Sequence, residues 1–177
     1  MKKLYLMRHS KAGQTDKHML NDHERPLTKK GEELVPNISA YFAKNYKDNP
    51  PQVILCSTAL RAKQTAAIFK KHFKVNPDIE IRTFQELYIT GTDEILSVIH
   101  KIESKFTSAL IISHNPGLQG FALKFSRSGD KQKFREMKAN FAPGSFATFE
   151  CDTKDWSSIA AESGTLLDFV NGKKLKG

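Results

Sequence analysis

Two arginines and two histidines stand just after short apolar segments of this sequence. Arg8 and His9 follow Leu-Tyr-Leu-Met, Arg61 comes shortly after Val-Ile-Leu-Cys, and His114 follows Leu-Ile-Ile-Ser. Guanidinium groups hold phosphate oxygens as planar forks with several donors, and a neutral imidazole nitrogen can act as a nucleophile. If these side chains meet in the fold, they form a pocket that suits a dianion, with phosphate as the natural candidate.

The apolar segments that precede these residues are typical of buried strands, because they are short, rich in branched residues and bounded by polar or proline signals. Ligands bind beyond the carboxyl ends of strands in open α/β sheets, so the side chains after three different strands can converge on one pocket. The predicted strands are Leu4–Met7, Val53–Cys56, Ile79–Arg82 and Ala109–Ser113, followed by Phe146–Phe149 and Leu166–Val170.

Amphipathic segments between these strands predict four helices. The first helix is capped by Thr28, contains Pro36 and runs to about Tyr46, and the second has an apolar stripe at Ala62, Ala66, Phe69 and Phe73. The third is capped by Thr92 and has its stripe at Ile95, Ile99, Ile102 and Phe106. The fourth is capped by Asn115, begins with Pro116 and has its stripe at Leu118, Phe121, Ala122 and Phe125. We expect Pro36 to kink its helix or to delay its start.

This alternation of strands and helices predicts an α/β fold with three layers, in which a mainly parallel central sheet has helices on both faces. The length of 177 residues fits a single domain, residues 1–177, and the polar, basic segment from Ser126 to Gly144 is expected to include a long loop.

Composition narrows the class of protein. The chain has 28 Lys and Arg against 19 Asp and Glu, a net charge of +9, which suits phosphate-bearing partners. The basic residues form no long run and no stripe with interleaved aromatics, so we expect no nucleic acid as partner. Apolar stretches are too short for a membrane span or a signal peptide, which predicts a cytoplasmic protein. Two distant cysteines indicate neither disulfides nor a metal knuckle.

Four ordered segments resemble the histidine phosphatase superfamily, and in particular its SixA-type phosphohistidine phosphatases. Arg8-His9-Ser10-Lys11-Ala12 is similar to the Arg-His-Gly signature of the superfamily. The other three segments are Asp22-x-x-Arg25-Pro26-Leu27-Thr28-x-x-Gly31, Ser57-x-x-x-Arg61-Ala62-x-Gln64-Thr65-Ala66 and Ser113-His114-Asn115-Pro116-Gly117-Leu118. The end of the chain, with Pro143-Gly144 and Trp156, is also similar to that subgroup.

The resemblance implies roles for the residues of the predicted pocket. His9 is the nucleophile that holds the phosphoryl group as phosphohistidine, and Arg8, Arg61 and His114 bind its oxygens. Ser10 stands where the superfamily usually has Gly; its hydroxyl and Asn115 are expected to contribute to substrate binding. The chemistry implied needs no metal ion and no cofactor.

The substrate depends on a proton donor. Relatives that act on phosphate esters use an acid to protonate the departing alkoxide, and Glu86, just past a predicted strand, is the candidate here. Without an acid, phosphohistidine is the better substrate, because its leaving imidazole has a pKa of about 6.5. We therefore expect a phosphorylated protein carrying a histidine phosphotransfer domain as partner, with a small phosphorylated molecule as the alternative, and a monomeric enzyme.

Other readings stay open from the sequence. Cys56 and Arg61 form Cys-x4-Arg, one residue short of the Cys-x5-Arg loop of cysteine phosphatases. A mutase or phosphatase of a small metabolite would share the fold, although the short chain leaves little room for insertions that build a sugar-acid pocket. A module that binds phosphorylated ligands without turnover needs the same basic pocket but no nucleophile.

Overall fold

A single seven-stranded sheet forms the centre of the computed structural model, which describes residues 1–14, 21–89 and 91–175. The strands are β1 (Lys2–Arg8), β2 (Val53–Ser57), β3 (Glu80–Phe84), β4 (Ser108–Ser113), β5 (Ser126–Gly129), β6 (Phe146–Cys151) and β7 (Gly164–Val170). Their order across the sheet is β3-β2-β4-β1-β6-β7-β5. β6 runs antiparallel to both β1 and β7, and the other pairs are parallel.

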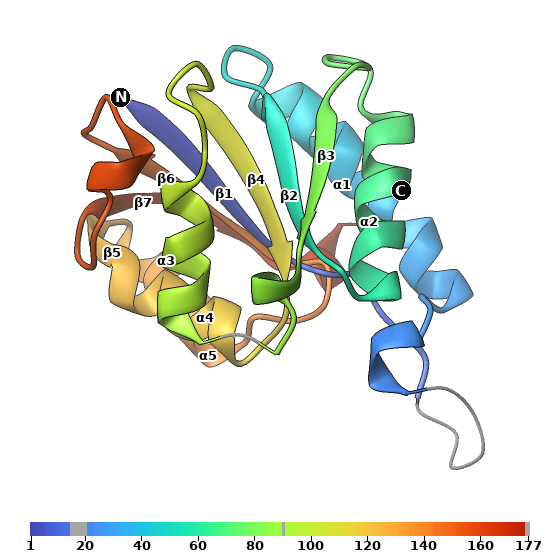
Figure 1. The fold of residues 1–177 in the computed structure, drawn as a ribbon. Helices are drawn as coiled ribbons and strands as arrows, with labels where there is room; N and C mark the ends of the chain where they lie inside the picture. Colours follow the sequence, from blue (N-terminus) through green and yellow to red (C-terminus); the bar gives the residue numbers. More distant parts are fainter. Residues whose placement is uncertain (15–20, 90, 176–177) are drawn as a thin grey trace.

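Helices cover both faces of the sheet (Figure 1). The helices of the described residues are α1 (Lys29–Asn45), α2 (Leu60–His72), α3 (Thr92–His100), α4 (Gly117–Phe125) and α5 (Lys131–Ala139), with short 3-10 turns η1 (Asp22–Glu24), η2 (Gln85–Leu87), η3 (Trp156–Ser158) and η4 (Gly172–Lys174). α1 and α2 pack on one face, and α3, α4 and α5 pack on the other. The predicted three-layer, mainly parallel α/β architecture is therefore confirmed.

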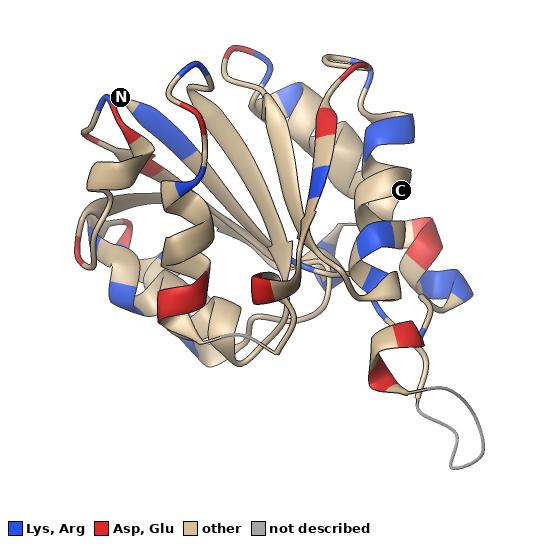
Figure 2. Cartoon of the chain, in the orientation of Figure 1, with Lys and Arg blue, Asp and Glu red and all other residues tan. Residues whose placement is uncertain are grey.

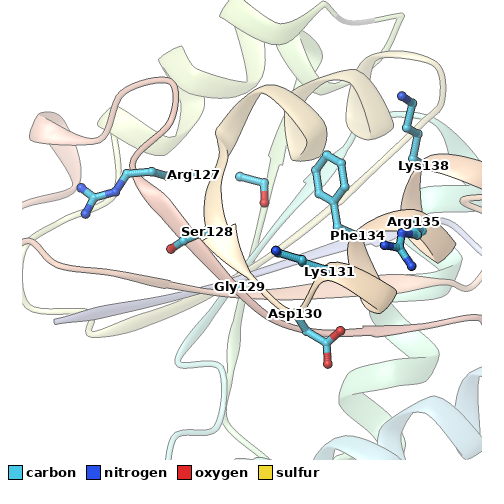
Figure 3. Close-up of a pocket in the computed structure, with 9 residues that line it drawn as sticks. Arg127, Ser128, Gly129, Asp130, Lys131, Phe134, Arg135 and Lys138 are labelled. Carbon is cyan, nitrogen blue, oxygen red and sulfur yellow. The ribbon is translucent and has the colours of Figure 1, made fainter.

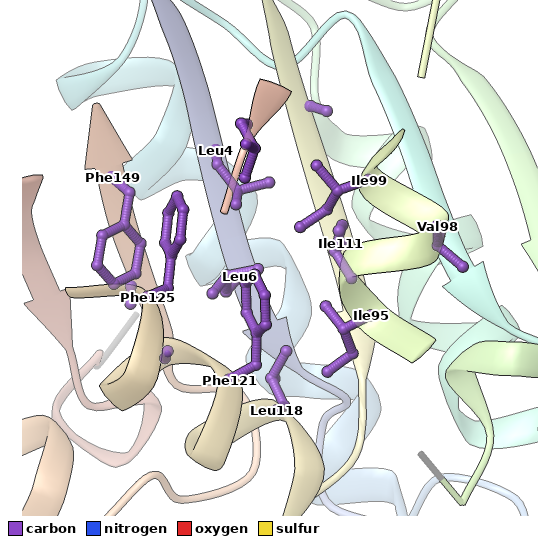
Figure 4. Close-up of a cluster of buried hydrophobic side chains, with 14 of the residues drawn as sticks. Leu4, Leu6, Ile95, Val98, Ile99, Ile111, Leu118, Phe121, Phe125 and Phe149 are labelled. Carbon is purple, nitrogen blue, oxygen red and sulfur yellow. The ribbon is translucent and has the colours of Figure 1, made fainter. Parts of the chain in front are cut away.

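Alternating side chains of the central strands supply both layers of the core. Leu4 and Leu6 of β1 face α3 and α4, as does Ile111 of β4, whereas Tyr5 and Met7 face α1 and α2 (Figure 4). All five are fully buried. Burying one such aliphatic side chain contributes about 1.5–3 kcal/mol to folding, so a strand buried on both faces is held firmly in register. This fixes the carboxyl end of β1, where Arg8 and His9 lie.

The predicted strands are all present, to within two residues at each end, but several helix boundaries differ. Thr28 caps α1 as predicted, its hydroxyl accepting from the amide of Gly31. The helix does not start late: it runs from Lys29 through Pro36. α3 is capped at Gly91 rather than Thr92, where the amide of Gly91 donates to the Glu94 carboxylate, and it ends at His100.

Two further corrections concern the second half of the chain. α4 begins at Gly117 with Pro116 at the N-cap position, so Asn115 is not the cap. The predicted long loop between Ser126 and Gly144 contains the edge strand β5 and the helix α5. Asp130 caps α5 by accepting hydrogen bonds from the amides of Gln132 and Lys133. Within the described residues, no helix combines the length and apolar character needed to cross a bilayer.

Candidate active site

The side chains predicted to meet do lie together. Their residues follow β1, β2 and β4, whose carboxyl ends lie at the same edge of the sheet (Figure 1). The amide of His9 donates to the carbonyl of Ser113 at 3.0 Å, which ties the end of β1 to the end of β4. The rings of His9 and His114 are 4.8 Å apart between centroids. Arg61 at the start of α2 places its Nε 3.3 Å from Nε2 of His9. Both histidines and Arg61 are buried.

The hydrogen bonds of His9 define its tautomer. Nδ1 lies 2.7 Å from the carbonyl oxygen of Ser10, which can only accept, so Nδ1 carries the proton and donates it. Nε2 is left with a lone pair directed toward Arg61. Burial, together with the positive charges of Arg61 and Arg8, lowers the pKa of His9 to about 3 despite the hydrogen bond to Ser10. The ring is therefore neutral at pH 7, the state that a nucleophilic imidazole requires.

His114 is held from the opposite side of its ring. Its Nε2 is 2.8 Å from the hydroxyl of Ser57 at the end of β2. Burial, and then the proximity of His9 and Arg61, lower the pKa of His114 to about 3. The Ser57 hydroxyl already accepts from the amide of Ala59 at 3.2 Å, so we assign its own proton to the bond with Nε2. The proton of the neutral His114 ring then sits on Nδ1, which is buried and has no partner. This leaves His114 with one free N–H donor.

Asp22 of η1 accepts hydrogen bonds from three side chains, one of which is Arg61. Its carboxylate accepts from Arg61 at 2.9 Å, from Arg25 at 2.7 Å and from the Tyr88 hydroxyl at 3.0 Å, and its backbone carbonyl accepts from Arg61 at 2.6 Å. Burial raises the pKa of Asp22, but the hydrogen bonds from Arg61, Arg25 and Tyr88 outweigh it and lower the pKa to about 2. Asp22 is thus ionised and fixes the guanidinium of Arg61.

Arg8 enters the site from the end of β1. Its guanidinium donates to the carbonyl of Phe141 at 3.0 Å, and its Nε is buried without a partner. Burial, followed by the charges of Arg25 and Arg61, lowers the pKa of Arg8 from its ordinary value. Three guanidinium groups thus face one carboxylate here, which leaves a net positive charge.

Every buried side-chain nitrogen or oxygen that lacks a partner in the described residues belongs to this site. The four atoms are Arg8 Nε, Arg25 Nε, His114 Nδ1 and Asn115 Oδ1. Buried polar groups are nearly always satisfied, so such a cluster needs an explanation. Three of the four are N–H donors, and an oxyanion, which can only accept hydrogen bonds, would provide the partners they lack.

A cavity of about 500 Å³ is lined by three of these four residues, Arg25, His114 and Asn115. Its lining residues come from η1, α2, the segment after η2 and the start of α4; they are Asp22, Arg25, Arg61, Tyr88, Ile89, Gly91, His114, Asn115 and Pro116. Arg8 and His9 are not among them. His9 is 6% exposed, and its Nε2 lies 3.3 Å from Nε of Arg61, which does line the cavity. The cavity therefore lies on the Nε2 side of His9, beyond Arg61.

Two of the predicted binding residues have other contacts. Ser10 is fully buried, and its hydroxyl donates to the carbonyl of Gly31 at 2.7 Å, so it holds the loop after β1 against α1 instead of pointing at a ligand. Asn115 lines the cavity, but its amide nitrogen donates to the carbonyl of Phe141 at 3.0 Å. Its unpaired atom is the acceptor Oδ1, which does not suit a phosphate oxygen.

The predicted proton donor lies outside the site. Glu86 is a half-buried residue of η2 whose carboxylate pairs with Lys101 at 2.7 Å, and it does not line the cavity. A thiolate nucleophile also fails, because burial raises the pKa of Cys56 to about 12. Within the described part of the chain, no group of three His, Cys, Asp or Glu side chains is placed to hold a metal ion.

Sequence reasoning gave too little weight to Asp22 and Arg25 and missed Tyr88. Both residues belong to a segment that resembles the superfamily, but the sequence does not show that Asp22 pairs with Arg61 as well as with Arg25. Tyr88 follows β3, the fourth parallel strand whose carboxyl end lies at this edge of the sheet. The strand-end rule, applied to that strand as well, points to the residues after Phe84. It does not by itself distinguish Tyr88 from Glu86.

Comparisons with known proteins agree with this geometry. Residues 4–94, just over half of the chain, match the family model described as histidine phosphatase superfamily (branch 1). An uncharacterised protein of Mycobacterium tuberculosis (strain CDC 1551 / Oshkosh) is 28% identical over 166 residues, which are 92% of this chain and 98% of the relative.

Solved structures share the fold over almost the whole chain. A candidate phosphohistidine phosphatase SixA from Nakamurella multipartitia superposes with a TM-score of 0.77 at 26% identity, covering 96% of this chain and 95% of that one. The protein histidine phosphatase SixA in complex with tungstate gives a TM-score of 0.74 at 19% identity, covering 98% and 99%. These matches agree with the α/β architecture predicted from the sequence.

Proposed function

We propose, on the premise that this chain belongs to the histidine phosphatase superfamily, that it removes a phosphoryl group from a histidine side chain of another protein. The chain is a phosphatase whose site supplies positive charge from arginines, so its chemistry needs no metal ion. The candidate substrate is a phosphorylated phosphotransfer domain of a phosphorelay.

One observation carries the proposal: three buried N–H donors without partners belong to residues whose charges or rings lie near the neutral imidazole of His9. They are Arg8 Nε, Arg25 Nε and His114 Nδ1. Phosphoryl transfer places charge on the equatorial oxygens, and donors already fixed in a water-poor site stabilise that charge most effectively. The donors therefore support binding of a phosphoryl group in front of Nε2 of His9.

The reaction follows in two steps. In the first, the Nε2 lone pair of His9 attacks phosphorus, and the bond between phosphorus and the substrate nitrogen breaks with its electron pair staying on that nitrogen. The other ring nitrogen of the substrate carries a proton, so the imidazole leaves as a neutral ring. In the second, a water molecule attacks the phosphoryl group on His9, the bond to Nε2 breaks, and inorganic phosphate leaves. In both steps the guanidinium of Arg61, held in place by Asp22, donates hydrogen bonds to the oxygens of the phosphoryl group.

The absence of a suitable acid among the described residues favours phosphohistidine over a phosphate ester. Asp22, with a pKa of about 2, is ionised at pH 7 and cannot give a proton. The Tyr88 hydroxyl already donates to Asp22, and burial raises its pKa. A leaving imidazole with a pKa of about 6.5 needs no such donor, whereas an alkoxide does.

Phosphate release tests the proposal, measured with a phosphohistidine-bearing phosphotransfer domain and with an aryl phosphate. Wild type should prefer the phosphohistidine substrate and keep its activity in EDTA. His9→Ala should lose at least about 10³-fold in rate, while the exposed histidine variant His72→Ala keeps the wild-type rate. A preference for the aryl phosphate that depends on Glu86, shown by its loss in Glu86→Gln, would instead favour a small phosphorylated substrate.

A further inference from the structure

A second cavity, of about 690 Å³, lies between the edge strand β5 and helix α5 (Figure 3) and shares no lining residue with the cavity of the candidate active site. Four of its lining residues are cationic: Arg127 of β5 and Lys131, Arg135 and Lys138 of α5. The three on α5 are spaced by four and three residues, so they lie along one face of the helix. All four are exposed. We call this cavity the basic groove.

The charge of the basic groove is not neutralised within the described residues. None of its four cations forms an ion pair there, whereas the neighbouring Lys133 pairs with Asp168 at 3.1 Å. The one acid of the groove, Asp130, is occupied as the cap of α5, where it accepts from two backbone amides. Figure 3 shows its side chain directed away from Lys131. The groove therefore presents an uncompensated positive surface.

The strand side of the groove favours an extended ligand. All four residues of β5 line the cavity, and β5 is the last strand of the sheet, paired only with β7 among the described strands. Its outer edge thus presents backbone groups without a strand partner, a surface to which an extended peptide can add. The one aromatic side chain of the groove, Phe134, is half-buried against the core. A single packed ring is a poor stacking platform for nucleic-acid bases.

Hydrogen bonds join the basic groove to the active site. Gln119 of α4 donates to the carbonyls of Met137 and Lys138 at the end of α5, at 2.9 and 3.0 Å. Two residues beyond α5, the carbonyl of Phe141 accepts from both Arg8 and Asn115. A protein segment bound along α5 is thereby tethered to the domain that holds the phosphoryl site, which raises the effective concentration at that site of a phosphohistidine on the same protein.

We propose that the basic groove docks an acidic, extended segment of the phosphorylated partner protein. The identity of the partner as a phosphohistidine protein rests on the proposed function, but the chemistry of the docking segment follows from the groove itself. Carboxylates of the segment meet Arg127, Lys131, Arg135 and Lys138, and its backbone lies along the outer edge of β5.

Binding of a fluorescently labelled peptide of alternating Glu and Ser tests this directly, in the His9→Ala background so that no turnover is involved. The double variant Lys131→Glu/Arg135→Glu should raise the Kd at least about tenfold, because two exposed attractions become repulsions. The matched control Lys44→Glu/Lys71→Glu makes the same change of net charge on α1 and α2, on the other face of the sheet, and should change the Kd less than about twofold.

Equal weakening by both double variants would overturn the proposal, since binding would then reflect net charge alone. Tighter binding of a single-stranded oligonucleotide, lost in the groove variant, would overturn it in favour of a nucleic-acid surface.

In the active enzyme the groove variant should raise KM for a phosphorylated phosphotransfer domain and leave aryl phosphate turnover unchanged. Specific peptide binding by a chain that does not hydrolyse phosphohistidine would refute the proposed function but not the docking site.

Discussion

The pKa values of His9 and His114 are both lower in the folded protein than the ordinary value for histidine. Each is buried beside a guanidinium group, and the pKa of each falls to about 3. A histidine that titrates near pH 6.5 would lose half of its nucleophile at that pH, whereas these rings stay neutral throughout the mildly acidic range. The cost appears in stability, because two neutral buried imidazoles must gain protons when the chain unfolds in acid.

The pH dependence of both activity and stability follows from these values. The ratio kcat/KM for an aryl phosphate, corrected for ionisation of the substrate, should show no inflection near pH 6.5 from the enzyme. Between about pH 6.5 and 3 the unfolded chain binds more protons than the folded one, so stability should fall as the pH falls, by up to ~1.4 kcal/mol per pH unit for each histidine. Denaturant titrations at pH 6 and 4.5 measure this slope, which His9→Asn should reduce; an unchanged slope would contradict the assignment.

Asp22 is predicted to act through Arg61 rather than on the substrate. Asp22→Asn removes the negative charge that fixes Arg61 and Arg25. We expect kcat to fall about tenfold while the pH at which activity is lost stays the same, because a misplaced guanidinium stabilises the transferring phosphoryl group less well. Glu24→Gln, an exposed change on the same turn, is the control and should leave kcat unchanged. A normal kcat in Asp22→Asn would show that Arg61 does not depend on this carboxylate.

At the scale of elements, the start of α1 holds the loop that follows His9, the proposed nucleophile. The hydroxyl of Ser10 donates to the carbonyl of Gly31, and the hydroxyl and amide of Thr28 donate to the carbonyl of Lys11. Gly31 packs so closely that an added Cβ would meet the carbonyl oxygen of Lys11. The orientation of His9, through the Ser10 carbonyl, therefore depends on a glycine in a helix on the neighbouring layer.

Gly31→Ala tests this packing. The methyl group must push the backbone at Lys11 away, so we expect a loss of about 2 kcal/mol or more in unfolding free energy and a lower kcat, although alanine is the better helix former. Gly13→Ala is the matched change in the same loop, where an added Cβ has no atom within 4 Å. Thermal melts and phosphatase rates of the two variants give the comparison; equal behaviour would rule out the packing argument.

The elements also show where reading the sequence succeeds. The central strands were predictable because parallel strands covered on both faces are continuously apolar, as in β2 and β4, which are buried at every residue. β5 has the sequence Ser-Arg-Ser-Gly and no apolar residue, so only its pairing with β7 defines it. α5 buries a single residue, Met137, and most of its other residues are charged or polar, so it offers no apolar stripe like those of the other helices. Both were therefore taken for a loop.

At the scale of the whole molecule, some parts of the site follow from local sequence patterns and others depend on contacts that form only in the assembled fold. The sequence predicts that His9, Arg61 and His114 meet because each follows a strand whose end lies at one edge of the sheet, and the three side chains do lie together. The contact of the Ser10 hydroxyl with Gly31 was not predictable, because the sequence does not show that α1 comes close enough to accept from it. Contacts between segments far apart in the chain, such as Asp22 with Tyr88 or Phe141 with Arg8, require the assembled fold.

The net charge of +9 is a property of the whole molecule and affects how it attracts charged partners. Figure 2 shows Lys and Arg spread over most elements rather than collected on one helix. A positive molecule attracts an acidic partner at long range, and salt screens that attraction. We expect kcat/KM for an acidic phosphorylated protein to fall about tenfold between roughly 0.05 and 0.5 M salt, and kcat/KM for an aryl phosphate to fall much less. Equal salt dependence for the two substrates would speak against a charged docking surface.

The central claim is that His9 carries the phosphoryl group, and trapping the phosphoenzyme tests it most directly. The enzyme is mixed with a phosphotransfer domain phosphorylated on histidine, quenched in base to preserve phosphohistidine, and mapped by mass spectrometry. The account predicts phosphate on His9 of wild type and none in His9→Ala. Phosphate on another residue, or turnover by His9→Ala at the wild-type rate, would contradict it.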